Sequence, residues 1–138
     1  MNIFFTFLLS ALVFTVLDLF WLVKVAPHLY RRHIGHLMAE KVNRIGALLF
    51  YVLYHVGLVV FVLLPAQGKL FEGWLLGSLF GLVTYATYDI TNLATLKAWP
   101  VKITVIDLLW GTFLTGVSTV ITLWLMPRNG ASDREASG

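Results

Sequence analysis

Four long apolar stretches, separated by short polar connections, take up most of this chain of 138 residues. They cover residues 3–23, 45–64, 73–96 and 103–126, each close to the roughly 20 apolar residues that a membrane-spanning helix requires. The composition is 59% hydrophobic and only 12% charged, and a soluble domain of this size carries more charge. We therefore predict an all-α membrane protein in which residues 1–126 form one transmembrane domain, a bundle of four helices.

Basic residues cluster beside the ends of these spans. Seven of the ten Lys and Arg lie in or beside the first and third connections, namely Lys24, Arg31, Arg32, Lys41, Arg44, Lys97 and Lys102. The positive-inside rule then places these two connections in the cytoplasm and both termini outside. The same placement favours anionic lipid headgroups, and not nucleic acid, as the partner of the basic residues.

The first connection, residues 24–44, is the only long one. Ala26-Pro27 is expected to stop the first spanning helix. Apolar and basic residues alternate after it, which predicts a short helix lying in the headgroup layer. The tail, residues 127–138, is polar and rich in small residues, which is typical of a disordered segment.

Neither a cofactor nor a metal is predicted. The chain has no cysteine, which excludes disulfides and thiolate-bound metals. It contains no phosphate-binding loop, dinucleotide fingerprint, nucleophile elbow or zinc-protease motif. His33, His36 and Glu40 would share one face of a helix that ran through all three, but histidines among basic residues at an interface usually meet headgroups instead.

Three aspartates lie inside the apolar stretches. Asp18 is six residues before Lys24, Asp107 is five after Lys102, and Asp89 is eight before Lys97. At 1.5 Å per helical residue, all three lie roughly 7 to 12 Å below the cytoplasmic boundary, in one layer. Burial and like-charge repulsion make it costly for all of them to be ionised. Intramembrane acids usually face a partner, a water-filled cavity or a substrate.

Other polar and aromatic residues are predicted at or near this layer. Together with the three aspartates, the candidate binding residues are Asn92, Arg44, Tyr51, Tyr85, Tyr88, His55 and Trp110. Arg44, at the rim, could hold one carboxylate charged, and His55, nearer the midplane, could relay protons. The alternative remains open: each aspartate hydrogen-bonds a neighbouring side chain and only holds the helices together.

Two rows of residues at helical spacing predict which helices pair. Gly73, Gly77 and Gly81 are followed at the same spacing by Tyr85 and Asp89, and a glycine stripe lets another helix approach closely in lipid. The last span has a matching row of small or polar residues, Asp107, Gly111, Thr115, Ser118 and Thr122. We expect the two rows to face each other, with Asp89 turned toward the neighbouring helix.

The chain also resembles a known family. The third span carries the run FGLVTYATYDITNLATL at 80–96, followed by Trp99-Pro100 and by DLLWG at 107–111. Further matching residues are Asp18 with Trp21, Tyr30-Arg31-Arg32, Gly35, Leu49-Phe50-Tyr51 with Tyr54, Gly57 and Pro65-Ala66. These features resemble the small bacterial membrane proteins grouped as domain of unknown function 2177. The resemblance implies a four-helix protein of the bacterial inner membrane, but it implies no activity and no catalytic residue.

Three functions fit these features. The first is proton-linked transport of a small cationic or zwitterionic molecule, with the aspartates alternating between proton and substrate. The second is a membrane-embedded enzyme, or its accessory subunit, acting on a lipid or isoprenoid through the same carboxyl groups. The third is a structural partner of another membrane protein. Since four helices enclose little volume, a transporter of this size is expected to form an oligomer, most simply a homodimer.

Overall fold

The computed structural model describes residues 2–126, and every regular element in this range is helical. Helix α1 (Ile3–Phe20) continues through a π-helical turn, η1 (Trp21–Val25), into α2 (Ala26–Ile34) and a short 3-10 turn, η2 (Gly35–Leu37). Helix α3 (Arg44–Leu58) ends in a second π-helical segment, η3 (Val59–Leu63). Helices α4 (Leu70–Thr95) and α5 (Val101–Leu125) complete the chain. The predicted all-α bundle is thus confirmed, whereas the predicted disordered tail, 127–138, lies outside the described residues.

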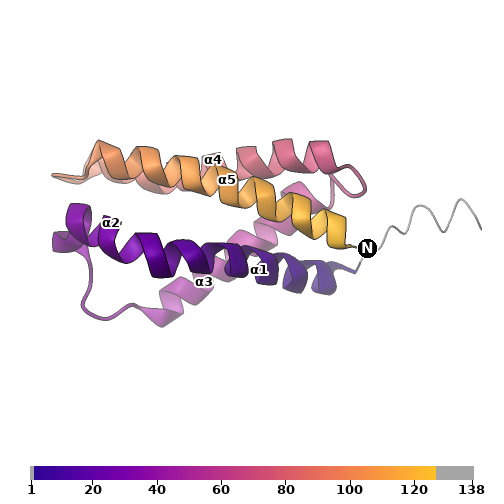
Figure 1. The fold of residues 1–138 in the computed structure, drawn as a ribbon, viewed down its shortest axis with the longest axis horizontal. Coiled ribbons are helices and arrows are strands. Elements are labelled where there is room, and N and C mark those ends of the chain that lie inside the picture. The colour runs from indigo at the N-terminus through magenta and orange to yellow at the C-terminus, as the bar shows by residue number, and fades with distance from the viewer. Residues whose placement is uncertain (1, 127–138) are drawn as a thin grey trace, which may run out of the picture.

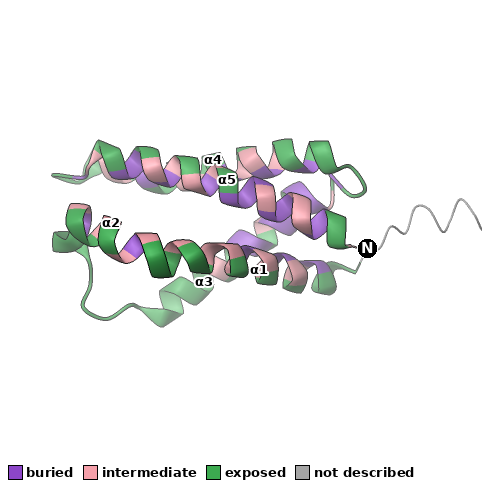
Figure 2. Ribbon diagram, viewed as in Figure 1, coloured by how far each residue is buried: buried purple, intermediate pink, exposed green. Residues whose placement is uncertain are grey.

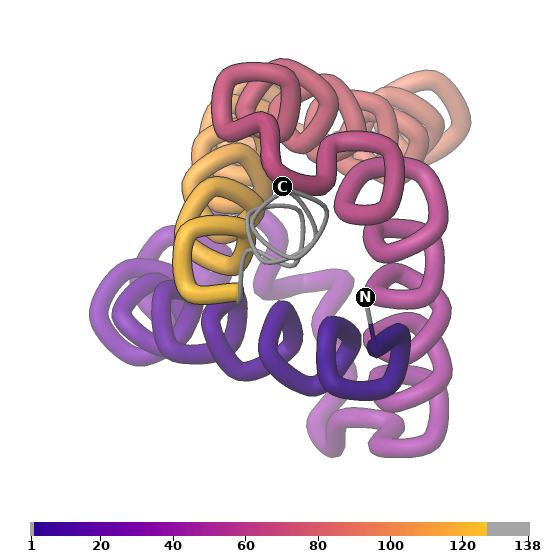
Figure 3. Tube along the Cα trace, turned by 90° about the vertical axis from the view of Figure 1, so that its right-hand side faces the viewer, coloured from indigo at the N-terminus to yellow at the C-terminus, as the bar shows by residue number. Residues whose placement is uncertain are grey.

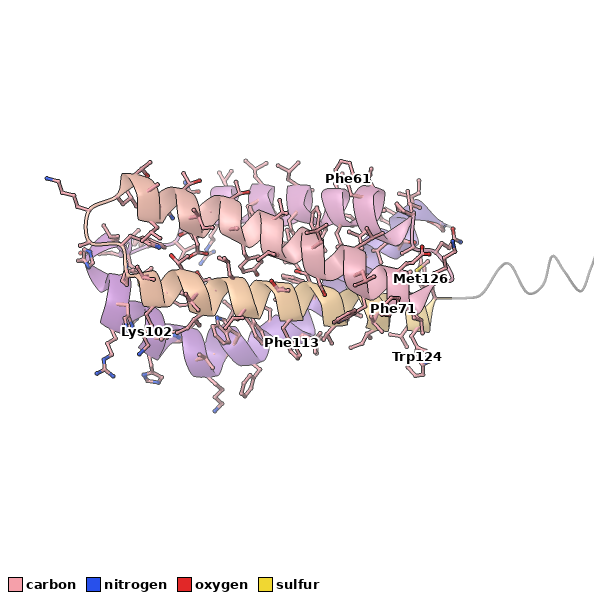
Figure 4. All side chains as sticks on the ribbon, turned by 90° about the horizontal axis from the view of Figure 1, so that it is seen from above. Phe61, Phe71, Lys102, Phe113, Trp124 and Met126 are labelled. Carbon is pink, nitrogen blue, oxygen red and sulfur yellow. The ribbon has the colours of Figure 1, made fainter. Side chains whose placement is uncertain are left out.

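The helices lie side by side and run the length of the molecule (Figure 1). In the end view they follow the order α4, α5, α1, α3 around the bundle (Figure 3). The chain reverses direction after η2, after η3 and after α4. The first and third connections therefore lie at one end, while the start of α1 and the end of α5 lie at the other (Figure 1). Lys102 marks the first end, and Trp124 and Met126 mark the second (Figure 4).

Three helical runs are long and apolar enough to cross a membrane, Ile3–Leu37, Arg44–Leu63 and Val101–Leu125. Helix α4 is less apolar, because glycine, threonine and tyrosine occupy much of it. Its 26 residues nevertheless extend roughly 39 Å, more than the thickness of a hydrocarbon core. It packs along α5. The predicted third span is therefore present as a helix, but one that hides its polar residues against a neighbour.

The expectation that Ala26-Pro27 stops the first helix is wrong. Proline has no N–H and its ring clashes with the carbonyl four residues earlier, so a regular α-helix cannot continue through it. Here η1 widens the helix just before Pro27, and the Ala26 N–H bonds to the carbonyl oxygen of Trp21, five residues back. The wider turn relieves the clash. Pro27 then occupies the first turn of α2, where its missing N–H costs nothing.

The short helix of the first connection therefore continues α1 instead of lying separately in the headgroup layer. Ile34 of α2 packs with Trp99 and Ile103, which belong to the α4–α5 connection and the start of α5. Arg31 and Arg32 of the same helix are exposed. Residues 38–43 then return to α3 without regular structure.

The surface of the bundle is apolar and its interior is partly polar, the reverse of a soluble protein. Large hydrophobic side chains are exposed along the outer faces of the helices, α3 above all, and buried residues form a stripe toward the centre (Figure 2). The buried set includes Thr6, Ser10, Thr115, Ser118 and Thr122 as well as acids and a histidine. This distribution suits a bundle whose outer surface meets lipid chains.

Helices α4 and α5 pair through the two predicted rows. A Cβ added to Gly77 would lie 2.5 Å from the Thr119 hydroxyl oxygen, and one added to Gly81 would lie 2.3 Å from the carbonyl oxygen of Gly111. One added to Gly111 would meet the ring of Tyr85 at 2.2 Å. Only glycine allows the two backbones to come so close. This approach fixes how α4 and α5 are rotated, and so buries Asp89 and Asp107.

Candidate functional site

Two carboxyl groups face a common pocket near the end of the bundle that carries α2 and the α4–α5 connection. Asp89 of α4 is 0% exposed and Asp107 of α5 is 6% exposed. The cavity measures about 330 Å³. Its lining residues are Tyr30, Phe50, Thr84, Tyr85, Tyr88, Asp89 and Asp107. We call it the acidic pocket; the glycine row positions Asp89 in it, because residues 81, 85 and 89 follow one face of α4.

The two acids have different hydrogen-bond environments. Asp107 accepts a hydrogen bond from the Tyr30 hydroxyl, which in turn accepts one from Nε1 of Trp21 at 3.3 Å. Neither oxygen of Asp89 has a hydrogen-bond donor among residues 2–126. The Asp89 and Asp107 carboxyl groups line the same pocket, where a direct hydrogen bond between them would form a bridge through one proton. Two ionised carboxylates are both acceptors, so such a bridge requires that proton.

Asp18 lies in a neighbouring cavity of about 170 Å³, not in the acidic pocket. Phe50 and Tyr85 line both cavities and form the wall that they share. Oδ1 of Asp18 accepts a hydrogen bond of 3.1 Å from Nε1 of Trp110, whose ring stacks on Trp21 at 4.5 Å between centroids. The single layer of three acids predicted from depth is therefore divided, in the structure, into a pair and a separate member.

Arg44 does not reach any of the three acids, contrary to expectation. Among residues 2–126 the structure has one ion pair, Lys69 with Glu72 at 3.7 Å. Arg44 is exposed in the first turn of α3, just after Asn43, whose side chain caps the helix by accepting from the Gly46 N–H. The first turn of α3 stands apart from α4 and α5 (Figure 1), the helices that carry Asp89 and Asp107.

Tyr51 lines the Asp18 cavity, and His55 packs behind it against other lining residues. The Tyr51 hydroxyl donates to the carbonyl oxygen of Ala11 at 2.8 Å and bonds the Thr15 hydroxyl. His55 is fully buried among aromatic rings, including that of Phe14, and its Nδ1 lies 2.9 Å from the Tyr51 carbonyl oxygen. A carbonyl only accepts, so Nδ1 carries the proton, and Nε2 has no partner among the described residues. His55 lines neither cavity.

The remaining predicted residues lie around the rim. Tyr88 lines the acidic pocket but is 59% exposed, and its ring meets Trp99 edge to face. Asn92 is half-buried one turn beyond Tyr88 and lines neither cavity. Trp110 is half-buried and acts through its bond to Asp18.

Three pocket residues, Tyr30, Phe50 and Thr84, were not predicted from depth or spacing. Tyr30 reaches the pocket only because α2 continues α1 past Pro27, which brings the Tyr30 hydroxyl to Asp107 of α5. All three residues do occur in the motifs that resemble the family, which is the signal that could have found them. The hypothetical metal triad fails on geometry, since Met38 is already extended and Glu40 is not on the helix of His33.

The fold and the buried acids define a helical, multi-pass membrane protein with a polar pocket inside the bundle. Residues 3–124 match the family described as a predicted membrane protein, domain of unknown function 2177. The chain belongs to this family, as its motifs had suggested. No curated protein and no solved structure matches it.

Proposed function

We propose that the protein binds a small organic cation in the acidic pocket in exchange for a proton, as the binding step of proton-linked transport. The observation that carries this proposal is Asp89, whose side chain is fully buried with no hydrogen-bond donor to either oxygen among the described residues. An ionised carboxylate in such a place costs several kcal/mol or more without a partner. A bridging proton or a bound cation supplies that partner, and the two compete for the same oxygens.

The lining of the pocket supports an organic cation. Tyr30, Tyr85 and Tyr88 contribute aromatic rings, and ring faces attract ammonium groups. A volume of about 330 Å³ lies at the small end of the range for small-molecule sites. Among residues 2–126, no Lys or Arg forms an ion pair with Asp89 or Asp107. This part of the chain therefore supplies no cation of its own to neutralise these two acids.

Binding of alkylammonium ions, from butyl to dodecyl, to protein in lipid nanodiscs tests the proposal. We expect saturable binding that Asp89→Asn abolishes, because Asn has nearly the same shape but carries no charge. Glu72→Gln is the matched control, since Glu72 lies far along α4 and pairs with Lys69. If no alkylammonium ion binds, or if Asp89→Asn binds as well as the wild type, the proposal is wrong.

The orientation proposed for this function is the one predicted from charge. The basic first and third connections face the cytoplasm of a bacterial cell, both termini lie outside the inner membrane, and the acidic pocket is then near the cytoplasmic side. The seven basic residues of these connections are all exposed, which supports contact with anionic headgroups. A reporter that works only outside the cytoplasm should be active when it is fused after Gly138. Activity of a strictly cytoplasmic reporter at this position would reverse the orientation.

A second candidate function is acid-base chemistry on a lipid or isoprenoid, as an enzyme or accessory subunit. The exposure of Phe50 and Tyr88 at the edge of the acidic pocket favours it, because a lipid substrate needs a lateral opening. In that case Asp89→Asn would abolish turnover of the lipid without any effect on cation binding. The proposals of a homodimer and of a purely structural role have no comparable observation in their favour.

A further inference from the structure

The space between α3 and α4 is wedge-shaped. The two helices meet where Gly57 and Tyr54 of α3 pack on Phe80 of α4, with the Tyr54 and Phe80 ring centroids 5.4 Å apart. From there toward its start, α3 tilts away from α4 (Figure 1), and the two helices make few further contacts. The acidic pocket lies in this wider part. Phe50 of α3 and Tyr88 of α4 both line the pocket and are both exposed, so the pocket is open on its side between these two helices.

Two aromatic residues stand at this open side. Phe50 of α3 is 62% exposed and Tyr88 of α4 is 59% exposed, yet both line the same pocket as the buried Asp89. Helix α3 belongs to a run that is long and apolar enough to span a membrane, so the exposed face of Phe50 meets lipid chains. The pocket thus has acids at its inner end and an apolar, lipid-facing outer end.

We propose that the ligand of the acidic pocket is an amphiphilic cation that reaches Asp89 from the bilayer, between α3 and α4. This inference rests on the proposed function and adds the chemical class of the ligand and its route. The ammonium head lies against Asp89 and Asp107, and the alkyl part passes between Phe50 and Tyr88 into the lipid. Charge selects the head, because Asp89 is unpaired among the described residues. The apolar opening between α3 and α4 favours ligands that carry an alkyl chain.

Chain length is the property that tests this route. Binding of butylammonium and of dodecylammonium is measured by calorimetry on protein in phosphatidylcholine nanodiscs. Protein-free nanodiscs are titrated in parallel, so that partition of the alkyl chain into lipid is subtracted. After this subtraction, dodecylammonium is expected to bind about tenfold more tightly, because its chain gains apolar contact with the pocket mouth. Equal affinity for the two ions overturns the lateral route.

A pair of phenylalanine variants locates the tail. Phe50→Ala should reduce the preference for the longer chain and leave butylammonium binding in place. Phe61→Ala is the matched control, because Phe61 belongs to the same helical run, is 66% exposed and lies toward the opposite end of the bundle (Figure 4). It should leave the preference unchanged. A preference that survives Phe50→Ala, or that falls equally in Phe61→Ala, contradicts the inference.

The outcomes separate this inference from the proposed function. Binding of both cations with dependence on Asp89 but without dependence on chain length keeps the proton-exchange site and removes the lateral route. Absence of binding by either cation removes both. Binding of dodecyl sulfate as tightly as dodecylammonium would show that the mouth takes alkyl chains without selection by the acids, and would also overturn the inference.

Discussion

Replacing Gly81 by alanine should weaken the packing of α4 on α5 more than any other single methyl group added on the glycine row of α4. The new Cβ would lie 2.3 Å from the carbonyl oxygen of Gly111 and 2.7 Å from Oγ1 of Thr115, where ordinary contacts begin near 3.4 Å. A backbone oxygen cannot rotate away, so the helices must separate locally by about 1 Å. Overpacking of this kind costs about 1–3 kcal/mol, and we take the upper value.

Alanine also favours the helical state by about 1 kcal/mol over glycine, so the net loss for Gly81→Ala is about 2 kcal/mol. Gly57→Ala provides the control. Its Cβ would meet the end of the Phe80 ring at 3.1 Å, and a side chain can move by a few tenths of an ångström. We expect this variant to differ from the wild type by less than about 1 kcal/mol.

The assay is unfolding in mixed micelles with increasing dodecyl sulfate, followed by the circular dichroism of the helices. The Gly81→Ala midpoint should fall clearly below those of the wild type and Gly57→Ala. If Gly81→Ala is as stable as Gly57→Ala, the close approach of α4 and α5 is not what holds the acidic pocket in place.

Three further changes test individual contacts in the same unfolding assay. Tyr30→Phe removes the hydroxyl that donates to the buried Asp107, and should lower the free energy of unfolding by about 1–3 kcal/mol. Tyr88→Phe, at an exposed position, should lower it by less than about 0.5 kcal/mol. Equal losses would show that the Tyr30 hydrogen bond does not stabilise the bundle. Arg44→Ala should change stability by no more than about 0.5 kcal/mol, because Arg44 is exposed and unpaired among the described residues. A loss of several kcal/mol would indicate that Arg44 does pair with one of the acids. Asp89→Asn should fold with unchanged or higher stability, because Asn is neutral and Asp89 loses no hydrogen bond from the described residues. A large loss would point to a scaffold role for Asp89.

The pairing of α4 with α5 could be predicted from sequence because a glycine every fourth residue has one strong meaning in a membrane helix. Gly73, Gly77 and Gly81 place an approach surface on one face. Asp89 continues that face, so its burial follows from the same spacing. The presence of the four helices was predictable for a similar reason, since apolar length alone indicates a span.

The composition of the site was harder to predict, because it depends on how helices bend and tilt. A proline normally predicts the end of a helix, and no local signal shows that the π turn at 21–25 lets the chain continue and bring Tyr30 to Asp107. Arg44 lies at the start of α3, which tilts away from α4 (Figure 1), and it forms no ion pair with the acids. Depth predicted that Asp18 joins the other two acids, but in the structure it lines a separate cavity, and Phe50 and Tyr85 line both cavities.

The most direct test of the account is the number of protons released for each cation bound. Calorimetric titration of the nanodisc-embedded protein with dodecylammonium, in two buffers that differ in ionisation enthalpy, measures this number. Because cation and proton compete for the Asp89 and Asp107 pair, we expect about one proton released per cation, and weaker binding as the pH is lowered. Asp89→Asn should neither bind the cation nor release a proton. Cation binding by the wild type with no proton release, and with an affinity that does not change with pH, would contradict proton exchange at the acidic pocket.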